Sequence, residues 1–137
     1  MVTLVGCGRQ KSVRPAQARR LYTGGLFRLA AAWAERHARR WFILSAKHGL
    51  VEPDQFLAPY DAYLPALSPS ERAALNKGVA DRLRALVPPT ETIVLLAGAE
   101  YAAFAPLVPH QVVQPLKGLP LGKRMAWLRR QLKRSAA

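Results

Sequence analysis

The chain has 137 residues, half of them apolar and 8% aromatic, which is enough to bury one hydrophobic core and too few for two. Its single cysteine excludes an intramolecular disulfide, and with three scattered histidines we expect no metal and no cofactor. We find no membrane-length apolar run and no signal-peptide pattern, so we expect one cytoplasmic domain over residues 1–137 that does not bind membranes.

Charge is distributed unevenly along the chain. The formal net charge is +13, and all eight acids lie within residues 35–100, where basic residues balance them. The excess of positive charge therefore lies at the two ends, before Glu35 and after Glu100. Two basic ends that fold onto one face would attract a polyanion, which predicts nucleic acid as the partner, with DNA favoured over RNA. Simple solubility and an anionic membrane surface are the alternatives.

The first predicted elements are a strand and a helix separated by a basic loop. Residues 3–5 and their neighbours are mostly apolar, which predicts a short buried strand that ends at the turn Gly6-Cys7-Gly8. A charged loop over residues 9–20 follows, and Gly24-Gly25 then precede an amphipathic helix predicted for residues 26–39. A strand that ends in a glycine turn and a charged loop is typical of a site at the strand's carboxyl end.

The middle of the chain predicts a second strand, a long loop and a helix. Residues 41–45 are bulky and apolar, which predicts a core strand that ends in a polar turn over residues 46–49. Prolines exclude regular structure from residues 51–67, so we expect a long ordered loop there. Ser68 then caps a helix, with Glu71 reaching back to the cap.

The last third of the chain predicts two further strands and a basic helix. Residues 92–96 form the clearest strand, and the glycine turn of residues 97–101 opens a short helix. A fourth strand is predicted for residues 111–114, and the last helix ends near residue 134. On that helix apolar residues form a buried stripe, while Trp127 lies among cations on another face.

This alternation of strands and helices predicts a single three-layer α/β/α domain with a central, mostly parallel sheet of about four strands. In such a sheet, ligands bind in the crevice outside the carboxyl ends of the strands. The strand ends would bring one set of polar side chains to that crevice: Cys7, Arg9, Gln10, Lys11, Ser45, Lys47, His48, Glu100 and Tyr101.

Cysteine and histidine side chains are the first catalytic candidates. Arg9 and Lys11 would stabilise a Cys7 thiolate, and His48 would act as its base if the two turns meet. The alternatives are packing of Cys7 as a small buried residue and a backbone-bonded loop role for His48. His110 is expected at the surface.

Two tyrosines and one aspartate each have two interpretations. Tyr22 and Tyr60 can stack on nucleic-acid bases, or they can plug the ends of the sheet. Asp61 follows Tyr60 in a loop able to fold over the basic crevice, where its carboxylate would face the substrate. The alternative for Asp61 is capping of a turn.

Six short motifs are spread along the chain: GCGRQK at 6–11, LYTG at 21–24 with Phe27, ILSAKHGL at 43–50, PYD at 59–61, LAG at 96–98 with Tyr101, and PL at 115–116 with Gly118, Gly122 and Arg124. Together they resemble a family of small bacterial and phage proteins catalogued as a domain of unknown function. Residues 44–50 and 59–61 also resemble the longer peroxide-stress YaaA family, which implies DNA binding and protection from oxidative damage. The layout is distantly similar to base-handling domains of tRNA-guanine transglycosylase relatives and uracil-DNA glycosylases.

We therefore expect a nucleic-acid-binding protein that acts on a base or damaged nucleotide, and cleavage of a base–sugar bond, as by a DNA glycosylase, is the sharper hypothesis. Asp61 would stabilise the cationic sugar, with His48 and Cys7 as the other catalytic candidates. The candidates for base binding are Gln10, Tyr22, Ser45, Tyr60 and Tyr101. The candidates for phosphate binding are Arg9, Lys11, Lys47, Lys117, Lys123, Arg124 and Arg130.

Two other classes of function remain open. One is a non-catalytic module that binds DNA or protects it from oxidative stress. The other is a small-molecule enzyme that uses Cys7 and Lys47 on a phosphorylated metabolite. A monomer is favoured for all three.

Overall fold

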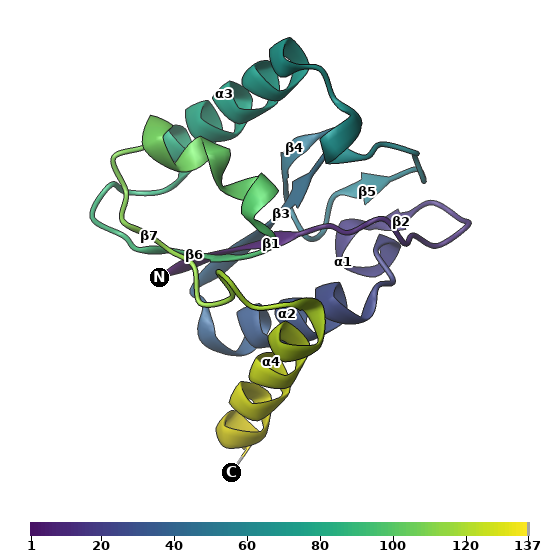
Figure 1. Ribbon diagram of the computed structural model, residues 1–137, viewed down its shortest axis with the longest axis vertical. Coiled ribbons are helices and arrows are strands. Elements are labelled where there is room, and N and C mark those ends of the chain that lie inside the picture. The colour runs from purple at the N-terminus through teal and green to yellow at the C-terminus, as the bar shows by residue number, and fades with distance from the viewer. Residues whose placement is uncertain (137) are drawn as a thin grey trace.

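The computed structural model describes residues 1–136, in which a mixed five-stranded sheet carries helices on both faces (Figure 1). The strand order is β4-β3-β1-β6-β7. Parallel pairs join β1 to β3, β1 to β6 and β6 to β7, and in this sheet, over the described residues, only β4 is antiparallel to its neighbour. The strands are β1 (Val2–Gly6), β3 (Arg40–Ser45), β4 (Gly49–Val51), β6 (Ile93–Leu96) and β7 (Val112–Val113). The predicted α/β class is confirmed.

The central strands are buried on both faces, which explains their continuous apolar sequences. Val5 and Ile43 are neighbours in the register of β1 and β3 and belong to the core on one face. Leu4 and Phe42, one position earlier in each strand, belong to the core on the other face. Each face therefore needs its own helical layer.

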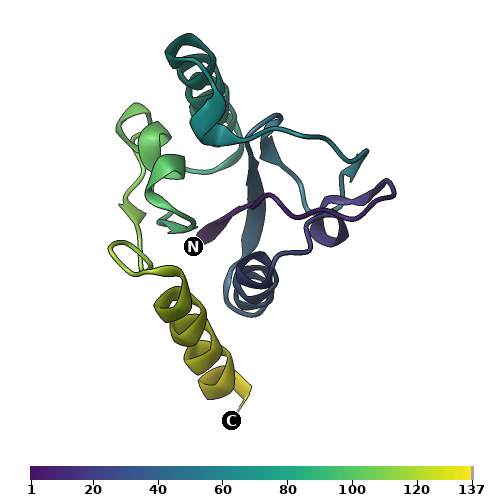
Figure 2. The same cartoon turned by 45° about the vertical axis from the view of Figure 1, so that its right-hand side comes forward.

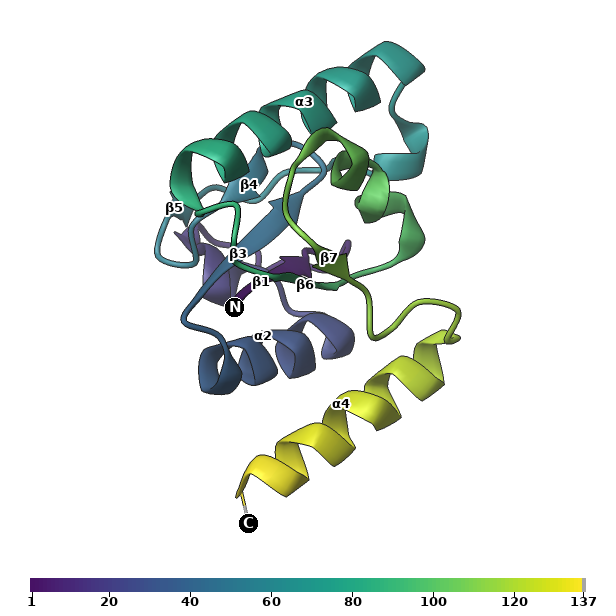
Figure 3. The same cartoon turned by 90° about the vertical axis from the view of Figure 1, so that its left-hand side faces the viewer.

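Helices on opposite sides of the sheet supply these two layers (Figure 3). The α-helices α2 (Gly25–His37) and α4 (Leu121–Ala136) cover one face, and α3 (Pro69–Leu86) covers the other together with the 3₁₀ helix η2 (Ala99–Leu107). The predicted capping box opens α3: the Glu71 amide donates to Ser68 Oγ at 3.1 Å, and the Ser68 amide donates to Glu71 Oε1 at 2.9 Å. None of the helices within residues 1–136 has the length and apolar character needed to cross a membrane.

The last helix, α4, lies beside α2 and runs in the same direction. At its start, a Cβ added at Gly25 would lie 2.9 Å from Met125 Cε, which places the first turns of the two helices in contact. Near its end, Arg36 donates to the carbonyl oxygen of Leu132 at 3.0 Å. The first turn of α4 therefore lies at the carboxyl edge of the sheet, and its last turn lies near the opposite edge.

The sheet has one strand more than the sequence predicts. Gly49 adopts a φ of +71°, a left-handed conformation that lets the chain reverse after β3 and return as β4. The segment expected to be irregular also contains β5 (Phe56–Leu57) and the 3₁₀ helix η1 (Leu64–Ala66). Figure 2 shows β5 beside the basic loop, which contains β2 (Ala16–Gln17) and leads into α1 (Ala18–Leu21). The antiparallel β2–β5 pair ties these two loops together.

The expected surface position of His110 is wrong. His110 is buried, and its Nε2 donates to the carbonyl oxygen of Val87 at 2.9 Å. This bond connects the segment before β7 to the residue that ends α3. A buried imidazole is tolerated here because one ring nitrogen has a backbone partner.

Candidate functional site

A crevice forms where β1 and β6 end side by side. The chain leaves β1 toward α2 on one face of the sheet, and it leaves β6 toward η2 on the other face (Figure 3). Connections that run to opposite faces open a gap between neighbouring strand ends. In open α/β sheets this switch point is the usual place for a ligand.

A cavity of about 350 Å³ occupies this crevice. Its wall combines the ends of β1 and β6, the first turn of α2, residues 62–65 of the long loop and the start of α4. The polar side chains in the wall are Arg9, Gln10, Tyr63, Glu100, Tyr101 and Arg124. Apolar walls with a few convergent polar groups are typical of small-molecule and cofactor sites, and the volume is in their range.

Glycines allow the backbone to approach closely at the floor of the cavity. A Cβ added at Gly6 would lie 2.8 Å from the Cβ of Ala97, so the ends of β1 and β6 meet only because position 6 is glycine. A Cβ added at Gly98 would lie 2.6 Å from both carboxylate oxygens of Glu100. The Glu100 carboxylate therefore lies directly over the Gly98 backbone, at the carboxyl end of β6.

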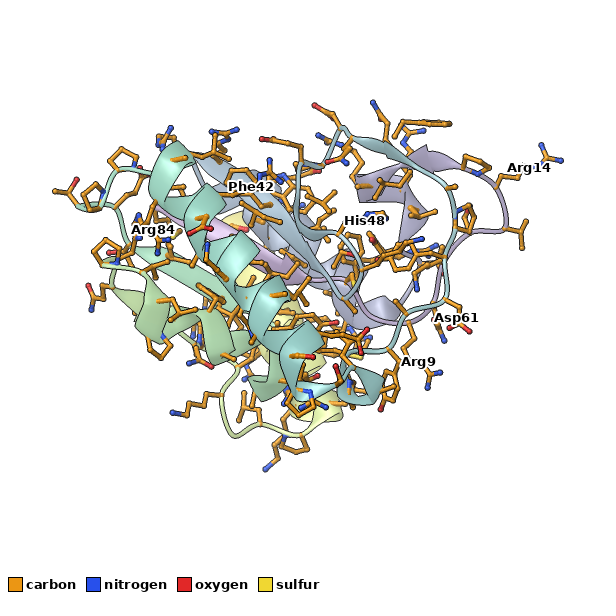
Figure 4. The ribbon with its side chains drawn as sticks, turned by 90° about the horizontal axis from the view of Figure 1, so that it is seen from above. Arg9, Arg14, Phe42, His48, Asp61 and Arg84 are labelled. Atoms are coloured by element: carbon orange, nitrogen blue, oxygen red, sulfur yellow. The ribbon has the colours of Figure 1, made fainter. Side chains whose placement is uncertain are left out.

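Two of the eight acids differ from the others in having no partner. Six take part in ion pairs or in the cap of α3: Glu35, Glu52, Asp54, Glu71, Asp81 and Glu91. Within residues 1–136, neither Asp61 nor Glu100 has an ion pair or a side-chain hydrogen bond. Both side chains are exposed, but Glu100 lines the cavity, whereas Asp61 is not part of its wall. In the view of Figure 4, Asp61 and Arg9 lie on the same side of the molecule, away from Arg84.

Two arginines from distant parts of the chain reach the same cavity. The Arg9 guanidinium lies 4.2 Å from the centre of the Tyr63 ring, a cation–π contact that holds the side chain at the rim. Arg124, in the first turn of α4, donates from Nε to the carbonyl oxygen of Leu119 at 2.6 Å. The first turn of α2 also lines the cavity and has no side-chain cap. Its amides add to the positive potential there.

A hydrogen-bonded cluster of Ser45, Tyr22 and Tyr60, here called the tyrosine cluster, lies beside the cavity. The Tyr60 hydroxyl is 2.5 Å from the Tyr22 hydroxyl and 2.6 Å from Ser45 Oγ. Ser45 Oγ also accepts the backbone N–H groups of Lys47 and His48 at 3.1 and 3.0 Å. With both lone pairs of Ser45 occupied, its own proton is donated to Tyr60.

Basic side chains surround the Tyr60 ring. Lys11 Nζ and Lys47 Nζ lie 4.5 and 5.6 Å from the ring centre, and the His48 ring meets it edge to face at 5.0 Å. Burial is the main cause that raises the pKa of Tyr60 far above its usual value, so the phenol keeps its proton at neutral pH. Partial burial, followed by the positive charge of Lys47, lowers the pKa of His48. The imidazole is therefore neutral at pH 7.

Tyr22 is packed into the protein and is not available to stack on a nucleic-acid base. Its side chain is 1% exposed, and its ring packs against Phe27 with 5.3 Å between ring centres. A base cannot stack on a ring that is covered in this way. Tyr22 therefore plugs the edge of the core, and its hydroxyl anchors Tyr60.

Cys7 is buried at 2% exposure, and its Sγ lies 3.4 Å from the hydroxyl oxygen of Tyr101. Its backbone amide continues the β1–β3 ladder by donating to the carbonyl oxygen of Leu44 at 3.0 Å. Burial is the main cause that raises the pKa of Tyr101, which therefore remains a neutral phenol. These contacts favour the packing interpretation of Cys7 over the nucleophilic one.

Residues 2–130 match a family described as a family of unknown function, DUF6884. The chain belongs to this family. No curated protein and no solved structure matches the chain. Membership in DUF6884 therefore brings no activity with it, and the chemistry of this DUF6884 protein has to be argued from the site itself.

The structure brings most of the predicted site residues of this DUF6884 protein to one end of the sheet. The residues in or around the tyrosine cluster are Lys11, Tyr22, Ser45, Lys47, His48 and Tyr60. The residues in the cavity wall are Arg9, Gln10, Tyr101 and Arg124. Four candidates lie outside both groups and are exposed: Asp61, Lys117, Lys123 and Arg130.

Glu100 is the residue of the cavity wall to which the sequence pattern assigns no chemical role. The signal was its position, two residues beyond the glycine turn that ends β6, and sequence reasoning placed it in the crevice without assigning chemistry to it. The sequence pattern instead favours Asp61 as the catalytic carboxylate, because Asp61 follows Tyr60 in the long loop. Among residues 1–136, no group of three or more histidine, cysteine, aspartate and glutamate side chains is arranged to hold a metal ion.

Proposed function

We propose that the cavity binds a nucleotide and that the protein hydrolyses the bond between its base and its sugar. One observation carries this proposal: a carboxylate without a partner, Glu100, lines a base-sized cavity together with Arg9 and Arg124. Cleavage of a base–sugar bond develops positive charge on the sugar, which a carboxylate stabilises. The phosphate of the same nucleotide needs cations at the rim, and the two arginines supply them.

The wall of the cavity suits the parts of a nucleotide. Phe27, Leu64 and Met125 offer apolar surface for a planar base. Gln10 offers an amide that can pair with a polar base edge, as amide side chains do with nucleobases. The phosphate would lie toward the arginines and the first turn of α2, where backbone amides favour an anion.

The reaction proposed is a hydrolysis and needs only water as a second reactant. The C–N bond between the sugar's anomeric carbon and the base breaks, and its electron pair stays with the base. Water forms a new C–O bond to the anomeric carbon and gives up one proton to the base nitrogen. The Glu100 carboxylate stabilises the cationic sugar between these events, and the products are a free base and a sugar hydroxyl.

Release of free base tests this proposal. Nucleotides and oligonucleotides carrying a range of modified bases are incubated with the protein, and free base is measured by chromatography. We expect Glu100→Gln to lower the rate by about 10²-fold or more, because the charge that stabilises the transition state is lost. Asp61→Asn is the matched control and should leave the rate nearly unchanged.

Two results contradict the proposal. One is full activity in Glu100→Gln, and the other is loss of activity in Asp61→Asn alone, which would return the catalytic role to the loop carboxylate. Gly98→Ala offers a second approach, since the added methyl group displaces the carboxylate of Glu100 without removing it. This variant should also lower the rate of base release.

A second candidate function is the non-catalytic one. The exposed cations of α4, which make no ion pairs within residues 1–136, favour a module that binds DNA and protects it. The resemblance of residues 44–50 and 59–61 to the YaaA family points to the same role in a cytoplasmic stress response. Tight binding of oligonucleotides without release of any base would support this candidate over hydrolysis. The buried position of Cys7 weighs against the small-molecule enzyme.

A further inference from the structure

The solvent-facing side of α4 carries a row of cations that the cavity does not use. Lys123, Arg130 and Arg134 are separated by seven and four residues, which places them on one face of the helix. That face lies opposite Leu128, the fully buried residue of the helix. Two further exposed cations flank the row on one side: Arg129 and Lys133. We call these five residues the α4 cation row.

The α4 cation row has no acidic partner within residues 1–136. Arginines elsewhere in the chain differ, since Arg19, Arg39 and Arg40 each pair with a glutamate. A helix whose cations face water without acids nearby has a strong, unbalanced positive potential. Such a potential attracts an anion with several charges in a line.

The apolar side of α4 is already occupied. Leu128 is 0% exposed. Trp127, which was expected among the cations of the helix, instead packs against the core, with its ring centre 6.5 Å from that of Trp33 of α2. A basic helix binds a membrane surface by inserting its apolar face among the lipids. In this protein that face packs against α2, so the charge pattern favours a polyanion in solution over a membrane.

The α4 cation row begins at the candidate site. Arg124 lines the cavity, and Lys123 precedes it in the first turn of the helix. From Lys123 to Arg134 the helix rises about 16 Å, at about 1.5 Å per residue. A stacked nucleic-acid strand places about five phosphates along that length. A strand with one nucleotide in the cavity can therefore continue along the helix.

We propose that the substrate is a polynucleotide strand, and that the α4 cation row binds the phosphates next to the nucleotide held in the cavity. This inference rests on the proposed function, because it names the substrate class of the same site. It separates two kinds of contact. The cavity recognises one nucleotide, and α4 provides affinity that depends on the length of the strand.

Binding of a strand and of its monomer tests this inference. The probes are a fluorescently labelled single-stranded DNA of about 16 nucleotides and the four deoxynucleoside monophosphates, titrated over a series of salt concentrations. Arg130→Gln/Arg134→Gln removes two cations from the row. Lys77→Gln/Arg84→Gln removes two cations from α3, on the opposite face of the sheet, and is the matched control. Circular dichroism confirms that both variants fold.

We expect the α4 variant to bind the DNA strand about tenfold more weakly at low salt, with the slope of log K against log salt reduced by about 1.4. Its binding of monophosphates should match that of the unchanged protein, and the α3 variant should resemble the unchanged protein throughout. Equal losses in both variants, or a strand that binds no better than a monophosphate, would overturn the inference and leave the cavity proposal standing.

Two further experiments are needed. One distinguishes the cavity proposal from the α4 proposal, and the other distinguishes a polynucleotide from a membrane surface. Glu100→Gln tests the cavity, so loss of base release without loss of strand binding leaves the α4 assignment intact. Vesicles that contain anionic lipid provide the second arm. Binding to these vesicles that depends on Arg130 and Arg134, with no binding of the DNA strand, would replace the polynucleotide with a membrane and overturn the inference.

Discussion

The hydroxyl oxygens of Tyr22 and Tyr60 lie 2.5 Å apart, and this contact joins the two loops that surround the candidate site. Tyr22 ends the basic loop after β1, and Tyr60 belongs to the long loop that precedes α3. Residues 62–65, just beyond Tyr60, form one wall of the cavity. The shape of the cavity therefore depends on a bond between side chains 38 residues apart.

We predict that Tyr60→Phe destabilises the protein by about 1–3 kcal/mol, because it leaves the buried Tyr22 hydroxyl without a partner. Urea unfolding followed by circular dichroism measures the loss. Tyr22→Phe should have a smaller effect, since Tyr60 keeps its bond to Ser45. In the double variant the Tyr22 hydroxyl is absent as well and is no longer left buried without a partner, so the loss should be smaller than the sum of the two single losses. Strict additivity would show that the two hydroxyls do not interact.

We predict opposite effects for alanine at two glycines. In Gly6→Ala the new methyl group would overlap Ala97, and overpacking of this kind destabilises proteins by about 1–3 kcal/mol. In Gly78→Ala the new methyl group meets no atom within 4 Å, and Gly78 lies inside α3. Helix propensity should then stabilise the protein by about 0.5–1 kcal/mol. Thermal unfolding of both variants measures whether stability falls or rises. A Gly6→Ala variant as stable as the unchanged protein would contradict the close packing of β1 and β6.

We predict that His48 titrates below its ordinary pKa of 6.5. Because the pKa is lower in the folded than in the unfolded protein, His48 lowers stability as the pH falls below 6.5. Lys47→Gln removes the positive neighbour and should move the pKa upward, although burial, the larger cause, remains. NMR titration of the imidazole protons in both proteins tests this. A pKa at or above 6.5 in the unchanged protein would contradict the packing of His48 against Tyr60.

The sequence predicted the central strands and α3 because their signals are local. Strands buried on both faces read as continuous apolar runs, and Ser68 and Glu71 form a capping box within four adjacent residues. The glycine turns at the strand ends then indicated where the crevice lies. For these elements, burial and capping act on the same short stretch of chain that carries the pattern.

The remaining features depend on contacts between distant residues. β4 has only three residues and forms because Gly49 turns the chain back onto β3, which no periodic pattern shows. His110 is buried because it meets a carbonyl oxygen 23 residues away. Asp61 lies outside the cavity wall because of the path of the long loop. That path is set by the bonds of Tyr60, which a sequence pattern does not reveal.

Because α4 packs against α2 through one side only, the attachment of the helix and its positive charge depend on different residues. The residues that attach the helix face inward, and the cations face outward. Substitutions in the outer row can therefore change how strongly the molecule attracts anions with little effect on folding. Evolution or an engineer could tune this DUF6884 protein to different salt conditions by exchanging a few surface arginines, while the cavity at the first turn of the same helix keeps its geometry.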